Sequence, residues 1–398
     1  MKIRRNVILS VLSIVLLSSL IQQNIYILVF YSLLLWALLP FKKWWRVDTC
    51  ALLLFTFFYT FMSIFGDQTQ SGFVTISYIV TPVAFYRLGY YLMTEYTAEI
   101  ERFRLLLLIG VTYLLNLFIL TIADVSIVGI VNDARTFTGV SADSDTLSAT
   151  LYGLMASLGI GCIGAAFSRN IKPIMRLCFF LLVGLSLLTV VHLVNRGGLI
   201  ILICSLFITI LLRNKKEKAK IVIYLGLLLT IGVFVLHSDM LNHDILMAYE
   251  QRNNVGGYEA TTIGGRTELW ITSFNNMLTH PLGWTQKSYA HNLWLDLAKV
   301  GGWFSLAPFL IVTIMLFKNI LKCLKKHYSS FHSAIIVLNV AMLLAASIEP
   351  VIEGSMLFFS LLMLVWGMTA SISKEHRYLK ITYNENFIFI STFLRGAY

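Results

Sequence analysis

Long apolar runs separated by short polar segments recur along the whole chain. Each run is roughly 14–20 residues long, close to the length that an α-helix needs to cross a bilayer. The runs predict twelve membrane-spanning helices, near residues 6–21, 24–41, 50–65, 73–91, 105–122, 147–167, 177–194, 199–212, 221–236, 303–317, 334–348 and 355–372. The pattern therefore predicts an all-α polytopic membrane protein, in which residues 1–398 form a single integral membrane domain.

The composition agrees with this prediction. The chain is 58% hydrophobic and 13% charged, whereas a typical soluble protein is about a quarter charged. The N-terminus, "MKIRRNVILSVLSIVLLSSLI", has the charged start and apolar run of a signal peptide. It lacks a clear small-residue cleavage site, and a second apolar run begins a few residues later. We therefore interpret it as an uncleaved first span.

Lysine and arginine are distributed unevenly between the loops. Twelve spans put both termini on one side, and the loops of that side contain 25 of the 31 Lys and Arg residues, against 6 in the alternate loops. Because positively charged loops remain in the cytoplasm, this asymmetry predicts cytoplasmic termini, a cytoplasmic tail at 373–398 and an external loop at 237–302. The positive charge thus indicates orientation in a bilayer, and no nucleic acid is expected as a partner.

The external loop contains the segment "GGRTELWITSFNNMLTHPLGWTQKSYAHNLW". Within it, "RTELWITSFNNMLTH" has helical spacing, with apolar side chains on one face and Arg266 one turn before Trp270. The spacing in "AHNLWLDLAKVGGWF" predicts a second amphipathic helix, with His291 at its start. We expect both short helices to lie at the membrane surface, where tryptophans such as Trp294 are favoured.

A third basic residue belongs to the same side. In "VVHLVNRGGLIIL", Arg196 lies in a short turn between two apolar spans. A charge so near the hydrocarbon is costly unless it has a partner, so we expect a functional role. Arg196, Arg266 and His291 are predicted to surround one outward-facing pocket. Two guanidiniums there can clamp a diphosphate, and a histidine nearby is suited to proton transfer.

Each of these residues also has a structural interpretation. Arg196 can anchor a helix end at the lipid headgroups, Arg266 can form an exposed ion pair with Glu268, and His291 can cap its helix. For the tryptophans, the interfacial belt is a better explanation than stacking on a sugar.

No metal site is predicted. The five cysteines lie in apolar spans or beside basic loops and never form a close pair. The segment "SADSDT" places Asp143 and Asp145 in an Asp-x-Asp arrangement. It belongs to a Ser/Thr/Asp-rich loop in which such a pattern arises easily, so a solvated loop is the preferred interpretation.

Together these motifs resemble the O-antigen ligase/polymerase superfamily of bacterial polytopic membrane glycosyltransferases. The matching segments are "NRGG" with Arg196, "GRTELW" with Arg266, and "HNLWLDLAKVGG" with His291 and Asn292. They occur in the family's order between about residues 180 and 318. The resemblance implies a GT-C-like fold in the bacterial inner (plasma) membrane, with the active site on the periplasmic or outer face.

The resemblance also implies an activity, the transfer of glycan from an undecaprenyl-diphosphate carrier to a sugar hydroxyl without a metal or other cofactor. By this analogy Arg196 and Arg266 bind the diphosphate and stabilise charge on the leaving group, and His291 acts as the general base. The other candidates for contacts with the substrate are Trp270, Asn292, Trp294 and Arg135.

The compact spacing of Arg266 and His291, 25 positions apart, favours a polymerase that extends lipid-linked repeat units of an O-antigen, capsule or exopolysaccharide. A chain-length regulator and a flippase are the protein partners that such an enzyme would have. One alternative is a ligase of the same superfamily, which transfers finished glycan to a lipid core or another acceptor. Another is a flippase or transporter for a lipid-linked oligosaccharide. That function needs charged residues along the spans, which here are nearly free of them.

Overall fold

The structure is a computed structural model of the 398-residue chain. It describes residues 2–17, 25–39, 46–65, 72–132, 135, 137, 149–168, 170–213, 218–219, 266–284, 289–326, 329–352 and 354–374. All regular secondary structure in these segments is helical. The predicted all-α class is therefore confirmed for this part of the chain.

The described helices follow the apolar runs closely. They are α1 (Lys2–Leu17), α2 (Ile25–Leu38), α3 (Val47–Phe65), α4 (Gly72–Glu95), α5 (Glu99–Val128), α6 (Ala149–Gly161), α7 (Ile163–Ala166), α8 (Pro173–His192), α9 (Arg196–Leu211), α12 (Arg266–Thr279), α13 (Leu293–Lys326), α14 (Ser330–Ile348) and α15 (Met356–Ile372). Each predicted span corresponds to one of them, or to the pair α6 and α7, except 221–236, which lies outside the described residues.

The lengths and composition of these helices are those of a membrane protein. Six helical segments in the described part are long and apolar enough to cross a bilayer: Val47–Phe65, Glu99–Val128, Ala149–Ala166, Pro173–His192, Leu293–Lys325 and Ser330–Ile348. Shorter apolar helices accompany them at Asn6–Leu17, Ile25–Leu38, Arg196–Leu211 and Met356–Ile372. At 1.5 Å per residue, α5 is about 45 Å long, longer than the roughly 30 Å hydrocarbon core.

α13 consists of two helical parts that meet at a kink. A short helix followed by a separate span at 303–317 was expected, and the break lies at Gly302 (φ 54°, ψ −149°), the non-helical residue between Leu293 and Lys326. The predicted break is therefore confirmed, and the second part extends to Lys326. A side chain at Gly302 would place its Cβ 2.0 Å from the carbonyl oxygen of Pro281. Glycine therefore permits both the change of direction and the close approach of the turn at Pro281.

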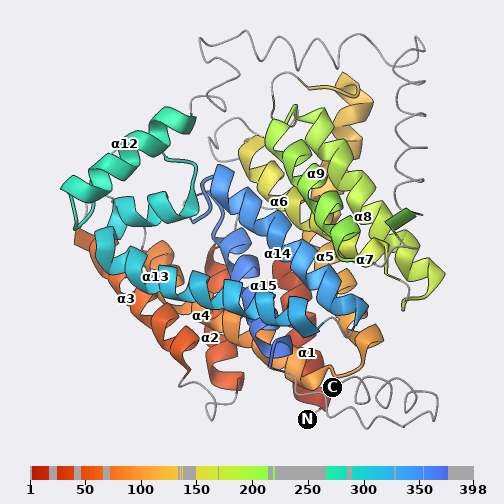
Figure 1. The fold of residues 1–398 in the computed structure, drawn as a ribbon, viewed down its shortest axis with the longest axis horizontal. Coiled ribbons are helices and arrows are strands. Elements are labelled where there is room, and N and C mark those ends of the chain that lie inside the picture. Colours follow the sequence, from red (N-terminus) through yellow and green to blue (C-terminus); the bar gives the residue numbers. More distant parts are fainter. Residues whose placement is uncertain are drawn as a thin grey trace, which may run out of the picture.

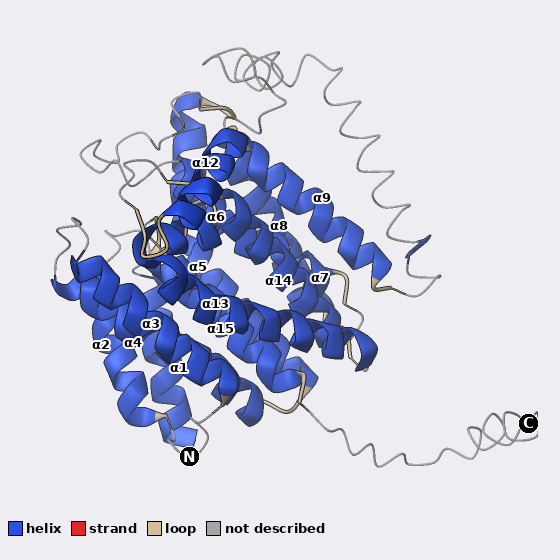
Figure 2. Cartoon of the chain, turned by 60° about the vertical axis from the view of Figure 1, so that its left-hand side comes forward, coloured by secondary structure: helices blue, strands red, loops and turns tan. Residues whose placement is uncertain are grey.

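α14 and α15 are buried over most of their lengths. Every residue of α15 is buried, and this helix packs against α4, while α14 packs against α6 and α9. Figure 1 shows α14 and α15 running between the other helices, with α12 far from the N-terminal end of α1, and Figure 2 gives a second view of this arrangement. The C-terminal end of α14 at Ile348 leads directly into the candidate site.

Candidate active site

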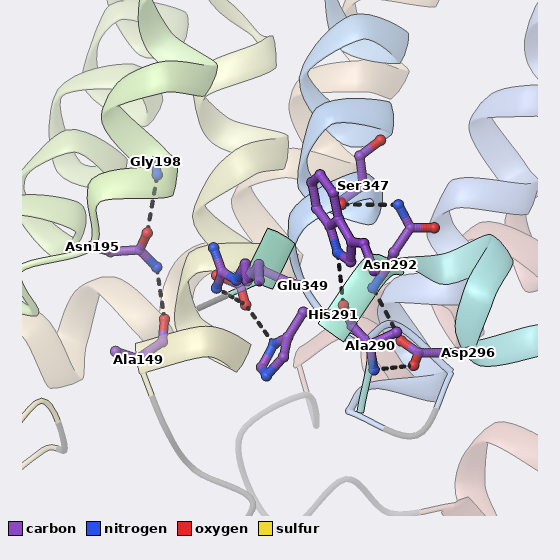
Figure 3. A network of polar contacts seen from close by, with 11 residues as sticks. Ala149, Asn195, Gly198, Ala290, His291, Asn292, Asp296, Ser347 and Glu349 are labelled. Carbon is purple, nitrogen blue, oxygen red and sulfur yellow. Dashed lines mark hydrogen bonds and ion pairs between the residues drawn. The ribbon is translucent and has the colours of Figure 1, made fainter. Parts of the chain in front are cut away.

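The candidate site is organised around Glu349, the residue that follows α14. Its side chain is only 6% exposed. Its Oε2 atom accepts a hydrogen bond from Arg266 Nη2 at 2.9 Å and lies 3.6 Å from His291 Nδ1 (Figure 3). A buried carboxylate is costly without a partner, so the guanidinium and the imidazole define where this side chain lies.

Two further arginines share this environment. Burial lowers the pKa of Arg135, the Glu349 carboxylate raises it, and the positive charges of Arg266 and Arg196 lower it further. Such effects are significant only between neighbouring charges. Arg135 therefore lies near Glu349, Arg266 and Arg196, and the positive charges in this region outnumber the one buried carboxylate.

The "NRGG" segment determines the position of Arg196 at the first residue of α9. Asn195 is the N-cap: its Oδ1 accepts from Gly198 N at 3.0 Å, and its Nδ2 donates to the carbonyl oxygen of Ala149 at 2.9 Å (Figure 3). A Cβ at Gly197 would lie 2.7 Å from Ile348 Cδ1. The absence of a side chain there lets the start of α9 approach the end of α14, which brings Arg196 towards Glu349.

His291 has a left-handed backbone, with φ 53°, and contacts on both sides fix this conformation. The Asp296 carboxylate accepts hydrogen bonds from Ala290 N at 2.7 Å and from Asn292 N at 3.2 Å. The indole N–H of Trp270 donates to the Ala290 carbonyl at 2.8 Å. Trp270 thereby attaches α12, which also carries Arg266, directly to the backbone beside the imidazole.

Asn292 connects the same segment to α14. Its Nδ2 donates to the carbonyl oxygen of Ser347 at 3.2 Å, two residues before Glu349. Its Oδ1 accepts from Trp294 N at 3.2 Å and from Leu295 N at 3.3 Å. Asn292, rather than His291, therefore caps the first part of α13, which leaves the imidazole available for Glu349.

Trp294 lies away from the charged groups. Its indole N–H donates to Thr313 Oγ1 at 3.1 Å, and its ring packs against the buried cluster of Met277, Ala298 and Leu306. The structure therefore does not bring Trp294 together with the other predicted site residues. Its contacts, like the hydrogen bond of Trp270, hold the two short helices of this region in place.

The segment that carries Arg135 is attached to a buried polar network. His192 Nε2 lies 2.8 Å from Asp124 Oδ2, and His192 Nδ1 lies 3.0 Å from the carbonyl oxygen of Ile130. Asn132 Nδ2 donates to Asp124 Oδ2 at 2.7 Å, and Asn132 N donates to the His192 carbonyl at 2.7 Å. Arg135 N then donates to the carbonyl oxygen of Asn132 at 3.1 Å. The ends of α5 and α8 thus position this arginine.

Glu349, Asn195 and Asp296 were not identified as site residues from the sequence. Glu349 did carry a signal, because it follows an apolar span in "SIEPVIEG" on the same predicted side as the arginines. Its partners Arg266 and His291 are distant in sequence, so only the fold shows that they meet. The capping role of Asn195 is indicated by its place just before a helical apolar run.

Candidate metal ligands do not gather in the described residues: these contain no group of three His, Cys, Asp or Glu side chains that could hold an ion. Asp143 and Asp145 lie outside the residues that the structure describes. The charged groups assembled here suit an anion instead, because guanidiniums bind phosphate oxygens through paired hydrogen bonds.

The comparison with protein families agrees with the motifs. Residues 178–310 match the model of a family described as O-antigen ligase. The chain is therefore similar to the O-antigen ligase family over this segment. It contains Arg196, Arg266, His291 and Asn292, whereas Arg135 and Glu349 lie outside it. The expected resemblance to the O-antigen ligase/polymerase superfamily is confirmed, and the family indicates a polysaccharide-related membrane enzyme. No curated protein matches the chain.

Proposed function

We propose that this protein, which is similar to the O-antigen ligase family, is a polymerase that extends lipid-linked repeat units of a surface polysaccharide. The donor would be a glycan on an undecaprenyl-diphosphate carrier. The observation that supports this is the contact of Arg266 and His291 with Glu349, together with Arg135, whose charge interacts with those of Glu349, Arg266 and Arg196. A diphosphate esterified at both ends carries two negative charges, which matches the excess of three guanidiniums over one carboxylate.

The proposed chemistry uses His291 as the general base. Because its Nδ1 faces Glu349, Nε2 is the atom that takes the proton of the acceptor hydroxyl. The hydroxyl oxygen forms a bond with the anomeric carbon, and the bond from that carbon to the phosphate oxygen breaks. The electron pair remains on the departing lipid diphosphate. The arginines stabilise its increased negative charge, and attack opposite the leaving group inverts the anomeric centre.

The proposal places this site on the outer face of the bacterial inner membrane, where the external loop 237–302 supplies Arg266 and His291, with both termini and the tail 373–398 in the cytoplasm. Twelve spans and a GT-C-like arrangement are part of it. The surface of α12 supports a location at the lipid boundary, because Ile271, Phe274 and Leu278 are 58%, 52% and 58% exposed. Such a face suits a helix lying in the headgroup region.

A ligase is the second candidate, because the matching family is described as O-antigen ligase. Donor binding and proton transfer would be the same in both enzymes, and only the acceptor differs. A polymerase joins one lipid-linked glycan to another, whereas a ligase moves the glycan to a lipid core or a different acceptor. The chain-length regulator and the flippase would be partners of the polymerase.

Reconstitution of the full chain with a lipid-linked oligosaccharide tests the proposal. With chelator present and no nucleotide sugar, we expect a ladder of longer lipid-linked glycans and release of undecaprenyl diphosphate. The Arg266→Ala variant should lose about 10²–10³-fold in rate, as when a group that stabilises developing charge is removed from other enzymes. The Glu268→Gln variant changes an exposed acid on the same helix and should retain wild-type activity.

Three results would contradict the proposal. One is a dependence on divalent metal, another is wild-type activity in Arg266→Ala, and the third is transport of the lipid-linked oligosaccharide without any new glycosidic bond. Transfer only to a lipid core, with no lengthening of the lipid-linked glycan, would identify the ligase. The unfolding temperature of each variant in lipid nanodiscs distinguishes lost chemistry from lost folding.

A further inference from the structure

We infer that Glu349 is a resident counter-ion, which the diphosphate of the donor displaces from Arg266 and which then pairs with His291 Nδ1. Binding of the donor would thereby complete the catalytic base. This inference rests on the proposed function and deepens it, because it concerns the regulation of the same site. Glu349 would be a positioning residue, since it acts on the acceptor through His291.

The first observation is that one carboxylate oxygen faces both partners. Oε2 of Glu349 is within hydrogen-bonding distance of Arg266 Nη2, at 2.9 Å, but is 3.6 Å from His291 Nδ1. That second distance is just beyond a hydrogen bond. Without substrate, the carboxylate is thus bound to the anion-binding arginine and only approaches the imidazole.

The second observation concerns the imidazole itself. His291 Nδ1 is buried and makes no hydrogen bond to the described residues. A buried nitrogen without a partner is unusual and costs free energy. In the proposed reaction this atom needs an acceptor, because the imidazole becomes positively charged when Nε2 takes the proton. A carboxylate a few tenths of an ångström too far away suits a contact that forms later in the cycle.

The other charged groups near His291 leave Glu349 as the acceptor. The guanidinium of Arg266, on α12, can only donate hydrogen bonds. The same holds for Arg135, whose charge interacts with that of Glu349, and for Arg196 near it. Asp296, on the helix that follows the histidine, is held by the backbone N–H groups of Ala290 and Asn292. Of the acids described around the imidazole, Glu349 is therefore the one whose oxygen can move to it.

The exchange follows from the charges. A doubly negative diphosphate is a stronger ligand for Arg266 than a single carboxylate, and it repels Glu349 as it enters. The displaced carboxylate is buried and must find another partner, and His291 Nδ1 is adjacent. After transfer, the departing lipid diphosphate leaves Arg266 without an anion, and Glu349 returns to it. The carboxylate thus opposes tight retention of the product.

A charge-removing substitution of similar shape, Glu349→Gln, separates this role from a purely structural one. Inorganic diphosphate binding is measured calorimetrically on the full chain in nanodiscs, and glycan transfer is measured on the same samples. We expect Glu349→Gln to bind diphosphate at least 5-fold more tightly than wild type and to transfer glycan at least 10-fold more slowly. If Glu349 only supported the fold, Glu349→Gln would bind diphosphate more weakly and also transfer glycan more slowly. Glu268→Gln should match wild type in both measurements.

Glu349→Asp is the second variant, which keeps the proposal testable if Glu349→Gln does not fold. It keeps the charge but shortens the side chain, so we expect diphosphate affinity within about 2-fold of wild type and slower transfer. Unchanged or weaker diphosphate binding by Glu349→Gln would overturn the exchange, as would full transfer activity in that variant. Tight diphosphate binding by a wild-type protein that makes no glycosidic bond would instead overturn the proposed function alone.

Discussion

At the scale of residues, backbone strain and buried charge coincide. Within the described segments, the residues other than glycine with positive φ are Arg135 (57°), Val194 (49°) and His291 (53°). Two of them belong to the charged cluster, and Val194 lies between His192 and the helix cap that precedes Arg196. Left-handed conformations cost roughly 1–2 kcal/mol for such residues and persist only where the surroundings enforce them. The strained residues lie at or next to this site, which indicates that its geometry lowers the stability of the fold.

The His192→Ala substitution should be strongly destabilising. It leaves the buried carboxylate of Asp124 without its imidazole partner and frees the segment that carries Arg135. Leaving a buried hydrogen-bonding group without one partner typically costs about 1–3 kcal/mol, and more for a charged group. We expect a lower unfolding temperature in nanodiscs and weaker diphosphate binding. The double variant Asp124→Asn/His192→Ala, which also removes the carboxylate charge, should recover part of the stability. A His192→Ala protein with wild-type stability would contradict this role.

The sequence was sufficient to propose the cations but not the anion that organises them. Arg196, Arg266 and His291 stand in motifs on the predicted outer side, and the structure places Arg266 and His291 beside Glu349 and Arg196 near Arg135. The apolar runs and the Lys and Arg distribution predict on which side of the membrane a residue lies. They do not predict which loops on that side are in contact. The pairing of Arg266 with Glu349, rather than with Glu268 nearby in sequence, depends on the start of α12 lying beside the end of α14.

At the scale of helices, glycines determine how the elements meet. The helical period predicted where most helices lie, because each has a long apolar run. It also predicted the break between the two parts of α13, but not the angle at which they meet. That angle depends on the left-handed residue Gly302 and on its contact with the turn at Pro281, neither of which changes the hydrophobic pattern.

The Gly302→Ala substitution should displace the first part of α13, which begins just after His291. A Cβ there would lie 2.0 Å from the Pro281 carbonyl oxygen at a backbone φ of 54°, so the chain must shift. We expect a lower unfolding temperature and at least a 10-fold slower transfer. Gly184→Ala is the matched control, because a Cβ there meets nothing within 4 Å. In the middle of α8 it should stabilise the protein by about 0.5–1 kcal/mol. Equal behaviour of the two variants would contradict the role of Gly302.

At the scale of the whole molecule, the site joins segments that are far apart in the chain. Glu349 follows buried α14, α9 begins at Arg196, and α12 begins at Arg266. The loop before α13 supplies His291, and the chain after α5 supplies Arg135. α14 and α15 are largely buried among the other helices. This packing holds the backbone at the end of α14, beside Glu349, in a defined position. The predicted span 221–236 lies outside the described residues, and the twelve-span topology stays a prediction.

The most direct measurement is an experimental map of the full chain in nanodiscs with saturating undecaprenyl diphosphate. The account predicts diphosphate density in contact with Arg135, Arg196 and Arg266, with the Glu349 carboxylate moved from Arg266 to His291 Nδ1. Density for the diphosphate elsewhere on the protein, or an intact Arg266–Glu349 pair beside an empty site, would contradict it.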